Sequence, residues 1–379
     1  MSKKSVIGNH SVVCLMAPTA SGKTALAYEL YDSGRYEIIS VDSALIYQDM
    51  DIGTAKPTKD ELLCYPHHLV DIIEPTQSYS VAEFVQDIEQ LIDAIHNRGK
   101  IPLLVGGTMM YYMALFDGLS ALPDSDVKVR AEVEAWRQAE GIEALHSYLS
   151  KVDPLSFERL KPNDSQRITR AIEVYRQSGR PISDWQAQPK QALAQHSKYQ
   201  WYAIAVMPDR AWLHKRIEQR LAIMWQQGLL EEVIGLLESH ALTPDMPSMR
   251  SVGYRQVLEY LTVTNHPVLQ QAHLETQAFY DAFLLGQTQD GLTTVSLPKL
   301  NSDAHKLACL NMQNKALYAT RQLAKRQTTW LRKLIKLSED WIDSAAGAAQ
   351  SQSVNASELA FMPVLHTFNT IEQARRYLE

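Results

Sequence analysis

Short apolar runs alternate with longer helical stretches along most of this chain. The runs end in turn residues, a pattern typical of buried strands. They lie at Val12–Met16, Tyr36–Val41, Ile101–Val105 and Trp201–Val206. Between them, Ala25–Tyr31 has no helix breaker, and Tyr79–Asn97 is amphipathic, with Ser80 and Glu83 forming a capping-box pattern near its start. Strands that alternate with helices predict an α/β fold, a parallel sheet flanked by helices.

Residues 123–200 follow a different pattern, because helical stretches succeed one another there without a strand between them. We predict a helical insertion domain in the α/β core, with helices over 126–140, 141–149 and 167–177. Farther on, residues 344–353 are linker-like in composition, and 370–379 are predicted to form a short helix. The predicted organisation is the first part of the core at 1–122, the helical insertion at 123–200, the completed core and a basic helix at 201–338 with a long insertion near 262–310, and a linker with a C-terminal tail at 339–379.

The loop between the first strand and the first helix carries a phosphate-binding motif. Gly22-Lys23-Thr24 stands at the opening of the helix, where backbone N–H groups and the helix dipole attract an anion. In such a loop the lysine reaches the terminal phosphate and the threonine holds Mg²⁺. The alternative is a chance match in an ordinary strand-to-helix turn. The predicted loop comprises Ala17, Pro18, Thr19, Ala20, Ser21, Gly22, Lys23 and Thr24.

Ala17 departs from the phosphate-loop pattern, which expects glycine at that position. Glycine is the residue that adopts left-handed backbone conformations without strain. We therefore expect the chain to turn at Ala17 in a conformation that tolerates a Cβ atom.

Two polar residues follow the next strands of the predicted sheet. Asp42 comes directly after Tyr36–Val41, and Thr108 follows the paired glycines after Ile101–Val105. Ligands of open α/β sheets bind beyond the carboxyl ends of the strands, so both side chains are expected near Lys23. Asp42 is a candidate general base or, alternatively, a helix N-cap. Thr108 is a candidate active-site hydroxyl that could also cap the next helix.

The distribution of charge is more informative than the net charge of −6, which by itself argues mildly against a nucleic-acid partner. No acidic residue occurs from Ala304 to Ser338, whereas basic residues recur there, and Leu317–Lys336 has a helical pattern. This basic helix is either a solvated surface or a phosphate-binding one.

Lys56, in a loop with glycine and proline, is either a second phosphate ligand or a surface charge.

The remaining composition is that of an ordinary globular protein. Its 379 residues, 45% of them apolar, suggest about two domains with a full core. The three cysteines form no CxxC pair, and we find neither a signal peptide nor an apolar run long enough to span a membrane. We therefore expect a cytoplasmic protein without a disulfide framework, zinc site or membrane span.

Taken together, the motifs resemble those of bacterial tRNA dimethylallyltransferases, also called tRNA isopentenyltransferases. A phosphate loop is shared by many NTPases, but the ordered set is highly specific. The matching stretches are Pro18–Thr24, Val41–Tyr47, Ile52–Pro57, Pro66–Asp71, Val105–Tyr112, Gln166–Arg170, Val252–Arg255 and Ala319–Arg332. Besides Ala17, one departure is the stretch between Gln256 and Leu317, longer than the family pattern by roughly 40 residues, a length that surface loops tolerate.

The resemblance implies a P-loop NTPase-like core that binds dimethylallyl diphosphate rather than ATP. It implies that the dimethylallyl carbon is joined to the exocyclic amine of the adenine 3′ to the anticodon of tRNA. Mg²⁺ would bind at Thr24, Asp42 would take the amine proton, and Thr108 would lie beside the reacting groups. The residues expected to contact the anticodon stem-loop are Asp42, Ser43, Ala44, Leu45, Arg130, Gln166, Arg167, Ile168, Thr169, Arg170, Arg250, Ser251, Val252, Gly253, Tyr254, Arg255, Lys325, Arg326 and Arg332. We expect a monomer whose helical insertion and basic helix clamp the anticodon arm from two sides.

Three other functions share part of this pattern. A small-molecule or nucleotide kinase would use the same loop, Mg²⁺ and a base at Asp42, and Arg167 and Arg170 would suit its lid. A prenyltransferase could act on free adenine nucleotides, and a non-catalytic RNA-binding protein could keep a vestigial loop. The acid-free basic helix argues against the first two, and the intact loop with Asp42 argues against the third.

Overall fold

The computed structural model describes residues 7–190, 192–284, 302–350 and 364–378. The chain divides into two compact units. Met1–Met113 together with Ser197–Glu379 forms the first, here called the core unit, and Ala114–His196 forms the second, here called the helical unit. Part of the predicted long insertion near 262–310, namely 285–301, lies outside the described residues.

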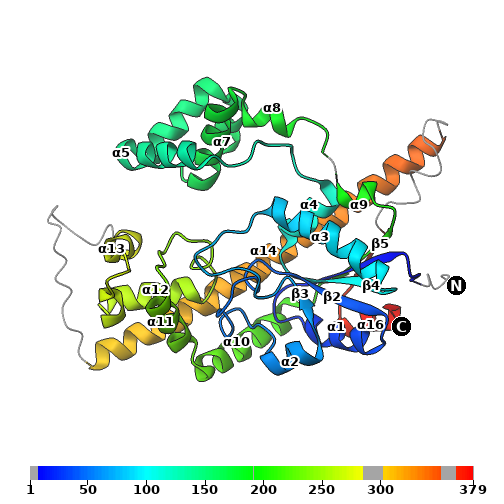
Figure 1. The fold of residues 1–379 in the computed structure, drawn as a ribbon, viewed down its shortest axis with the longest axis horizontal. Helices are drawn as coiled ribbons and strands as arrows, with labels where there is room; N and C mark the ends of the chain where they lie inside the picture. Colours follow the sequence, from blue (N-terminus) through cyan, green and yellow to red (C-terminus); the bar gives the residue numbers. More distant parts are fainter. Residues whose placement is uncertain (1–6, 191, 285–301, 351–363, 379) are drawn as a thin grey trace. The chain divides into compact units, whose positions relative to one another are not determined.

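The core unit is built on a six-stranded sheet in the order β3-β2-β4-β1-β5-β6 (Figure 1). All its strand pairs are parallel. The strands are β1 (Ser11–Met16), β2 (Tyr36–Val41), β3 (His67–His68), β4 (Ile101–Gly106), β5 (Gln200–Val206) and β6 (Val364–Phe368). The four predicted strands are confirmed. Because β2, β4 and β1 are neighbours, the loops that follow them open side by side at the carboxyl edge of the sheet.

Helices pack on this sheet and extend the core unit beyond it (Figure 1). They are α1 (Lys23–Asp32), α2 (Lys59–Cys64), α3 (Val81–Asn97), α4 (Met109–Asp117), which leads into the helical unit, α10 (Arg210–Gln227), α11 (Leu229–Ser239), α12 (Tyr254–Val263), the 3-10 helix η1 (Pro267–Gln270), α13 (Thr276–Leu284), α14 (Ser302–Gln350) and α16 (Ile371–Leu378). The predicted capping box opens α3, since Ser80 Oγ accepts from Glu83 N at 3.1 Å and Glu83 Oε2 accepts from Ser80 N at 2.7 Å.

The basic helix is confirmed as part of α14, but this helix is longer than predicted. It continues through most of the linker-like stretch 344–353 and ends at Gln350. Alanine has the highest helix propensity of all residues, and the alanines of this stretch offset the cost of the single Gly347. The prediction of a linker there was wrong up to residue 350.

The C-terminal residues are part of the sheet layer rather than a detached tail. β6 pairs with β5 from Tyr202↔Val364 to Val206↔Phe368, which adds an edge strand to the sheet. α16 confirms the predicted short helix and packs with α1 in one apolar cluster. β6 was missed because a five-residue strand at a sheet edge gives too short a pattern to separate from a loop.

The helical unit contains only helices among its described residues, as predicted for the insertion. They are α5 (Val127–Val152), α6 (Pro154–Arg159), α7 (Ser165–Ser178), α8 (Ile182–Gln186) and α9 (Leu193–His196). Gly141 interrupts α5 with φ 80° and ψ 168°, at the position where one predicted helix gives way to the next. Leu145, Leu149, Ile168 and Ile172 form part of its own apolar core.

Candidate active site

The phosphate loop, Ala17–Thr24, joins β1 to α1 at the carboxyl edge of the sheet. Positive φ angles occur at Ala20 (61°) and Gly22 (94°), and not at Ala17, so the expectation that the chain tolerates a Cβ atom at Ala17 is confirmed. Ala17 is buried, and its N–H donates to Gly106 O at 3.3 Å. The strain of a left-handed alanine at Ala20 is typical of loops shaped for a ligand.

Ser21 places an unpaired hydroxyl inside this loop. The residue is 2% exposed, and its Oγ has no hydrogen-bond partner among the described residues. A buried polar group without a partner costs about 1–3 kcal/mol. An oxygen-rich ligand that reached this hydroxyl would recover part of that cost.

Lys23 is the cation that opens α1, and its charge is tuned by its surroundings. Burial lowers the pKa of Lys23 from 10.5 to about 8; nearby Asp42 raises it and nearby Arg220 lowers it. Burial also lowers the pKa of Arg220, which Asp42 raises. Lys23, Arg220 and Asp42 therefore form one electrostatic group, as the sequence predicted for Lys23 and Asp42. A bound anion would offset the cost of burying the two cations.

Two arginines of α10 belong to this site and were missed in the sequence. Arg216 Nε donates to Ala20 O at 2.8 Å, and an Arg220 guanidinium nitrogen donates to Thr19 Oγ1 at 3.2 Å. They stand four residues apart, on the same side of the helix, beside the buried apolar stripe of α10. The sequence does show two arginines beside the apolar stripe of this helix, which could have marked them as candidates. That α10 crosses the phosphate loop is seen only in the fold.

Asp42 and Thr108 occupy adjoining loops of the same sheet edge, as predicted. Thr108 Oγ1 accepts a hydrogen bond from Ser43 N at 3.0 Å, and Asp42 Oδ1 accepts one from Ala44 N at 2.9 Å. The residues after Asp42 form turns and not a helix, so the alternative of an N-cap at Asp42 was wrong. The bond from Ser43 N joins the loop that carries the candidate base to the loop that carries the candidate hydroxyl, and the bond from Ala44 N orients the Asp42 carboxylate within its own loop.

Gln327 of α14 ties the phosphate loop to the loop after β4. Its Oε1 accepts from Thr19 N at 2.9 Å, and its Nε2 donates to Gly107 O at 2.9 Å. A Cβ atom built on Gly107 would lie 2.5 Å from Gln327 Nε2, so any side chain at this position would displace the Gln327 amide. Gln327 lies within the matching stretch Ala319–Arg332 but was not predicted as a site residue.

The residues near the phosphate loop are suited to bind Mg²⁺ together with a phosphate-bearing substrate. Mg²⁺ keeps several waters and takes one or two protein oxygens plus phosphate oxygens, so it needs no all-protein cage. Thr24 is exposed in the first turn of α1, and Asp42 supplies a carboxylate at the same edge. Within the described ranges no group of three or more His, Cys, Asp or Glu side chains is arranged to hold a metal ion. The donor set fits an ion that arrives with a diphosphate.

Several residues of the matching stretches have a structural role, because their polar groups are bonded to other parts of the protein. Glu232 accepts hydrogen bonds from the backbone N–H groups of 51–53 at 2.6–3.1 Å and from Tyr254 Oη at 2.5 Å. Lys56 is buried and paired with Asp51 at 2.7 Å and with Asp71. Both interpretations of Lys56 were therefore wrong, because its charge is neutralised inside the protein.

The predicted RNA-contact residues of the core unit differ in exposure. Ser43 is exposed, and Ala44 and Leu45 are partly exposed, so the loop after β2 offers backbone and side chains to a ligand. In the motif after α11, Arg250 is exposed and Ser251, Val252 and Arg255 are partly exposed. Gly253 and Tyr254 are buried, and the Tyr254 ring is fully enclosed. Its side chain serves the fold through Glu232 and is not accessible for RNA contact.

The predicted contacts of the helical unit cluster at the start of α7. Gln166 and Arg167 are exposed, and Arg130 is exposed on α5. Arg170 is partly buried and donates to Pro123 O at 2.7 Å, while Thr169 Oγ1 donates to Gln166 O at 3.2 Å. Ile168 is fully buried in the unit's core, so its side chain cannot contact RNA in this arrangement.

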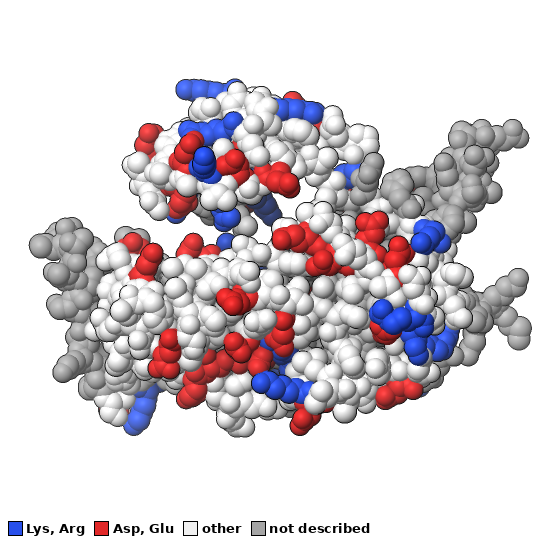
Figure 2. All heavy atoms as spheres, viewed as in Figure 1, with Lys and Arg blue, Asp and Glu red and all other residues white. Residues whose placement is uncertain are grey.

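The cations of α14 that were predicted to contact RNA are exposed to solvent. Lys325, Arg326 and Arg332 are exposed, whereas Gln327 points inward to Thr19 and Gly107. Lys325 and Arg332 stand two helical turns apart and share one side of the helix. Figure 2 shows acidic side chains spread over the face of the core unit seen there, with only small groups of Lys and Arg.

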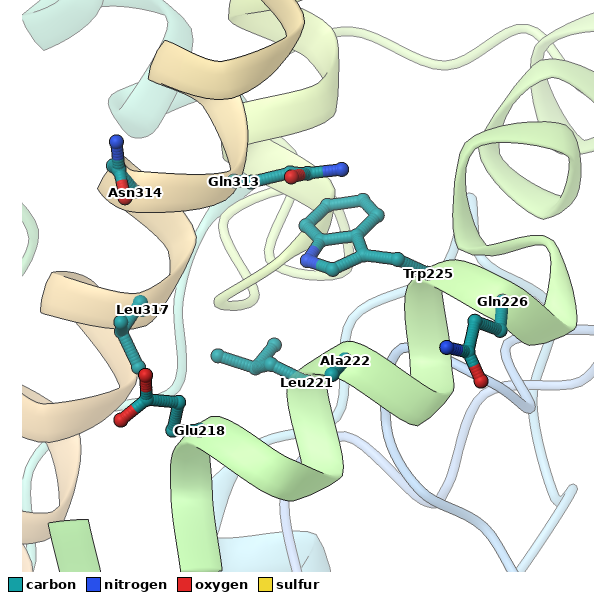
Figure 3. A pocket seen from close by; sticks show the side chains of 8 residues that line it. All are labelled: Glu218, Leu221, Ala222, Trp225, Gln226, Gln313, Asn314 and Leu317. Atoms are coloured by element: carbon teal, nitrogen blue, oxygen red, sulfur yellow. The ribbon is translucent and has the colours of Figure 1, made fainter. Parts of the chain in front are cut away.

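A pocket of about 350 Å³ lies between α10 and α14 (Figure 3). The Trp225 indole projects into it, with Leu221 and Leu317 below and the Gln313 amide beside the ring. None of the predicted site residues lines it. It is a feature of the packing between these two helices and does not include the phosphate loop.

Comparison with known proteins gives a consistent result over nearly the whole chain. A family model described as IPP transferase matches residues 45–334. The tRNA dimethylallyltransferase of Psychrobacter cryohalolentis is 61% identical over 396 aligned positions, which cover 98% of this chain and 94% of that relative.

Solved structures give the same result for the fold. The full-length tRNA isopentenylpyrophosphate transferase of Bacillus halodurans is 27% identical with a TM-score of 0.51, covering 97% of this chain and 93% of that one. A eukaryotic dimethylallyltransferase acting on tRNA shares the fold at 22% identity, with a TM-score of 0.64 and coverage of 96% and 75%.

Proposed function

This chain belongs to the IPP transferase family, and from that premise we propose that it is a tRNA dimethylallyltransferase. It transfers the dimethylallyl group of dimethylallyl diphosphate to the exocyclic amine of the adenine 3′ to the anticodon, giving isopentenyladenosine and diphosphate. Family membership argues against the kinase alternative, which shared the phosphate loop, Mg²⁺, a base at Asp42 and the arginines of α7.

The chemistry divides into bond breaking and bond making. The C–O bond between the allylic carbon and the diphosphate breaks, and the electron pair leaves with the diphosphate oxygen. The adenine amine, a poor nucleophile because its lone pair is delocalised into the ring, forms a new N–C bond to that carbon. Asp42 takes the proton that the amine loses. Catalysis therefore rests on stabilising the leaving diphosphate and on positioning the two reactants.

The phosphate loop provides the stabilisation of the leaving group. N–H groups at the start of α1, the Lys23 ammonium and the Arg220 guanidinium surround the place where negative charge develops. We propose that Thr24 holds Mg²⁺ there, which when bound neutralises further charge on the diphosphate. The Ser21 hydroxyl, unpaired among the described residues, would donate to a diphosphate oxygen.

The single observation that carries this proposal is the electrostatic group of Lys23, Arg220 and Asp42. It joins an anion-binding loop to a carboxylate at the same edge of the sheet, next to the Ser43–Thr108 hydrogen bond. A leaving diphosphate and an amine that loses a proton need this pairing of cations with one nearby base.

The partner and setting of the enzyme follow from the same proposal. We propose that exposed cations of α7 and α14 contact the anticodon stem-loop of tRNA, whose adenine leaves the loop stack at a cost of a few kcal/mol. No described helix is long and apolar enough to cross a membrane, and all three cysteines are free. We propose that the protein is a monomer and that it acts in the reducing cytoplasm. Light scattering on the purified protein would test the monomeric state.

The test is mass spectrometry of nucleosides from unmodified tRNA incubated with the protein, Mg²⁺ and dimethylallyl diphosphate. We expect adenosine to gain the mass of one isopentenyl group. A parallel reaction with ATP in place of the allylic diphosphate is the control. ATP hydrolysis or phosphate transfer without prenylation would contradict the proposal.

A further inference from the structure

The C-terminal strand and helix meet the phosphate loop at the carboxyl edge of the sheet. β6 pairs with β5, and β5 pairs with β1, so one row across the sheet joins Thr367, Ala205 and Met16. Phe368 is therefore level with the first residue of the phosphate loop. α16 begins at Ile371. The register of the sheet thus places the start of α16 beside the loop, and Figure 1 shows α16 next to α1.

Ile371 makes the contact between α16 and the loop. A Cβ atom built on Gly22 would lie 3.7 Å from Ile371 Cγ1, so this side chain covers Gly22 at van der Waals distance. Gly22 turns the chain into α1 with a φ of 94°, a conformation that presents the first N–H groups of the helix to an anion. Ile371 is 8% exposed and packs in the same apolar cluster as Leu26 of α1.

Polar contacts fix the first turn of α16 and attach it to α1. Thr370 Oγ1 accepts from Gln373 N at 3.2 Å, and Gln373 Oε1 accepts from Asn369 N at 3.0 Å. Arg375 donates to Glu29 Oε1 at 2.6 Å, which links the next turn to the outer side of α1. These hydrogen bonds therefore connect the end of β6 to the first turn of α16, and α16 to the helix that follows the phosphate loop.

We propose that α16 is a positioning element of the diphosphate site and that Ile371 is its positioning residue. Ile371 holds Gly22 in the left-handed conformation in which the loop receives a diphosphate. Affinity for an anion is higher when the donors are already ordered, because less conformational freedom is lost on binding. The inference rests on the proposed function, since the ligand it invokes is the diphosphate group.

The segment that carries this role is outside the family match. The family model ends at residue 334, whereas β6 and α16 span 364–378. The phosphate loop itself lies before the start of that match at residue 45. The contact between Gly22 and Ile371 therefore joins two parts of the chain that flank the matched region.

The experiment measures the affinity of the full-length protein for inorganic diphosphate with Mg²⁺ by titration calorimetry. Ile371→Ala removes the Cγ1 atom that faces Gly22, and we expect the dissociation constant to rise about fivefold, within the usual range for positioning effects. Ile371→Val keeps a Cγ1 atom, so its affinity stays near that of the wild type. Leu378→Ala is the matched control, because Leu378 is 7% exposed in the same helix and cluster but lies two turns from the loop.

The variants separate positioning from simple stability. We expect Ile371→Ala and Leu378→Ala to lower the melting temperature by similar amounts, while only Ile371→Ala weakens diphosphate binding and raises KM for dimethylallyl diphosphate. Equal affinity of the wild type and Ile371→Ala would overturn the inference alone, as would equal weakening by Leu378→Ala. Absence of diphosphate binding by the wild type would overturn both this inference and the proposed function.

Discussion

The phosphate loop and the outer side of α14 both present basic side chains, but in different settings. Around the loop, Lys23 and Arg220 are partly buried, carry pKa values lowered by burial and share one carboxylate, Asp42. On α14, Lys325 and Arg332 are exposed to solvent on a helix segment free of acidic residues. The first setting suits one small anion at a fixed place, and the second suits an extended, hydrated polyanion.

The difference teaches how the same charge can serve two kinds of recognition. Buried cations are weakly screened by salt and are ordered before the ligand arrives, so each one has a large, specific effect. Exposed cations gain affinity mainly by releasing counterions from a nucleic acid, so their effects are smaller and depend on salt. The predictions below test this contrast, in order of decreasing effect.

The largest effect is expected from the carboxylate that the two loop cations share. Asp42→Asn keeps the size and the oxygen that accepts from Ala44 N but cannot take the amine proton. We expect kcat to fall by about 10²–10⁴, the usual contribution of a general base. Diphosphate affinity should change much less than kcat, because no cation of the loop is removed. Single-turnover prenylation measures the first quantity and calorimetry the second; full activity of Asp42→Asn would exclude Asp42 as the base.

Removing Arg220 tests whether the partly buried cations bind the small anion. Arg220→Ala should weaken binding of inorganic diphosphate about 10- to 100-fold, as expected for a charged hydrogen bond. Arg216→Ala is the matched control on the same helix, and it should have a smaller effect because Arg216 is exposed. If the two variants weakened binding equally, burial would not distinguish the cations.

The lowered pKa of Lys23 predicts a pH dependence of diphosphate binding. In the free protein the ammonium loses its proton as the pH rises through about 8, so the charge that binds diphosphate is present below that pH and lost above it. The dissociation constant should therefore be flat below pH 8 and rise by up to about tenfold per pH unit above it. Lys23→Arg keeps its charge at these pH values and should show a flatter profile. Parallel profiles for both proteins from pH 7 to 9.5 would contradict the assignment.

The smallest effects are expected from the exposed cations of α14. Lys325→Ala and Arg332→Ala should each reduce the slope of log Kd against log salt for tRNA by about 0.7–0.9. Diphosphate affinity should not change. Lys306→Ala is the control, because Lys306 is exposed on the same helix about 28 Å from Lys325. If both variants bound tRNA as the wild type does across a salt series, α14 would not be part of the RNA-binding surface.

The central parallel strands and the polar edge were predictable because their signals are local. Four apolar runs, the glycine-lysine-threonine motif and the residues after each strand place Lys23, Asp42 and Thr108 together without knowledge of the tertiary structure. The helices of the insertion were predictable for the same reason, as the break at Gly141 shows.

The rest depends on packing between distant segments, which no local pattern encodes. Arg220 and Gln327 reach the phosphate loop only because α10 and α14 cross it, and they lie 201 and 308 residues after Thr19 in the chain. Tyr254 has the residue type of an RNA contact, yet its hydroxyl is bonded to Glu232 in the core. Burial of this kind follows from the fold and not from the motif.

The position of Gln327 has a thermodynamic consequence, because this residue connects the phosphate loop to a helix that also carries exposed cations. The Gln327 amide is hydrogen-bonded to the phosphate loop and to the loop after β4, while Lys325 and Arg332 on the same helix are exposed to solvent. A ligand that displaces α14 from outside therefore also displaces a hydrogen-bond partner of Thr19. By linkage, the factor by which RNA changes the affinity for the allylic diphosphate equals the factor by which the diphosphate changes the affinity for RNA. The Gln327 amide is therefore a physical route by which the affinities for the two proposed ligands can be coupled.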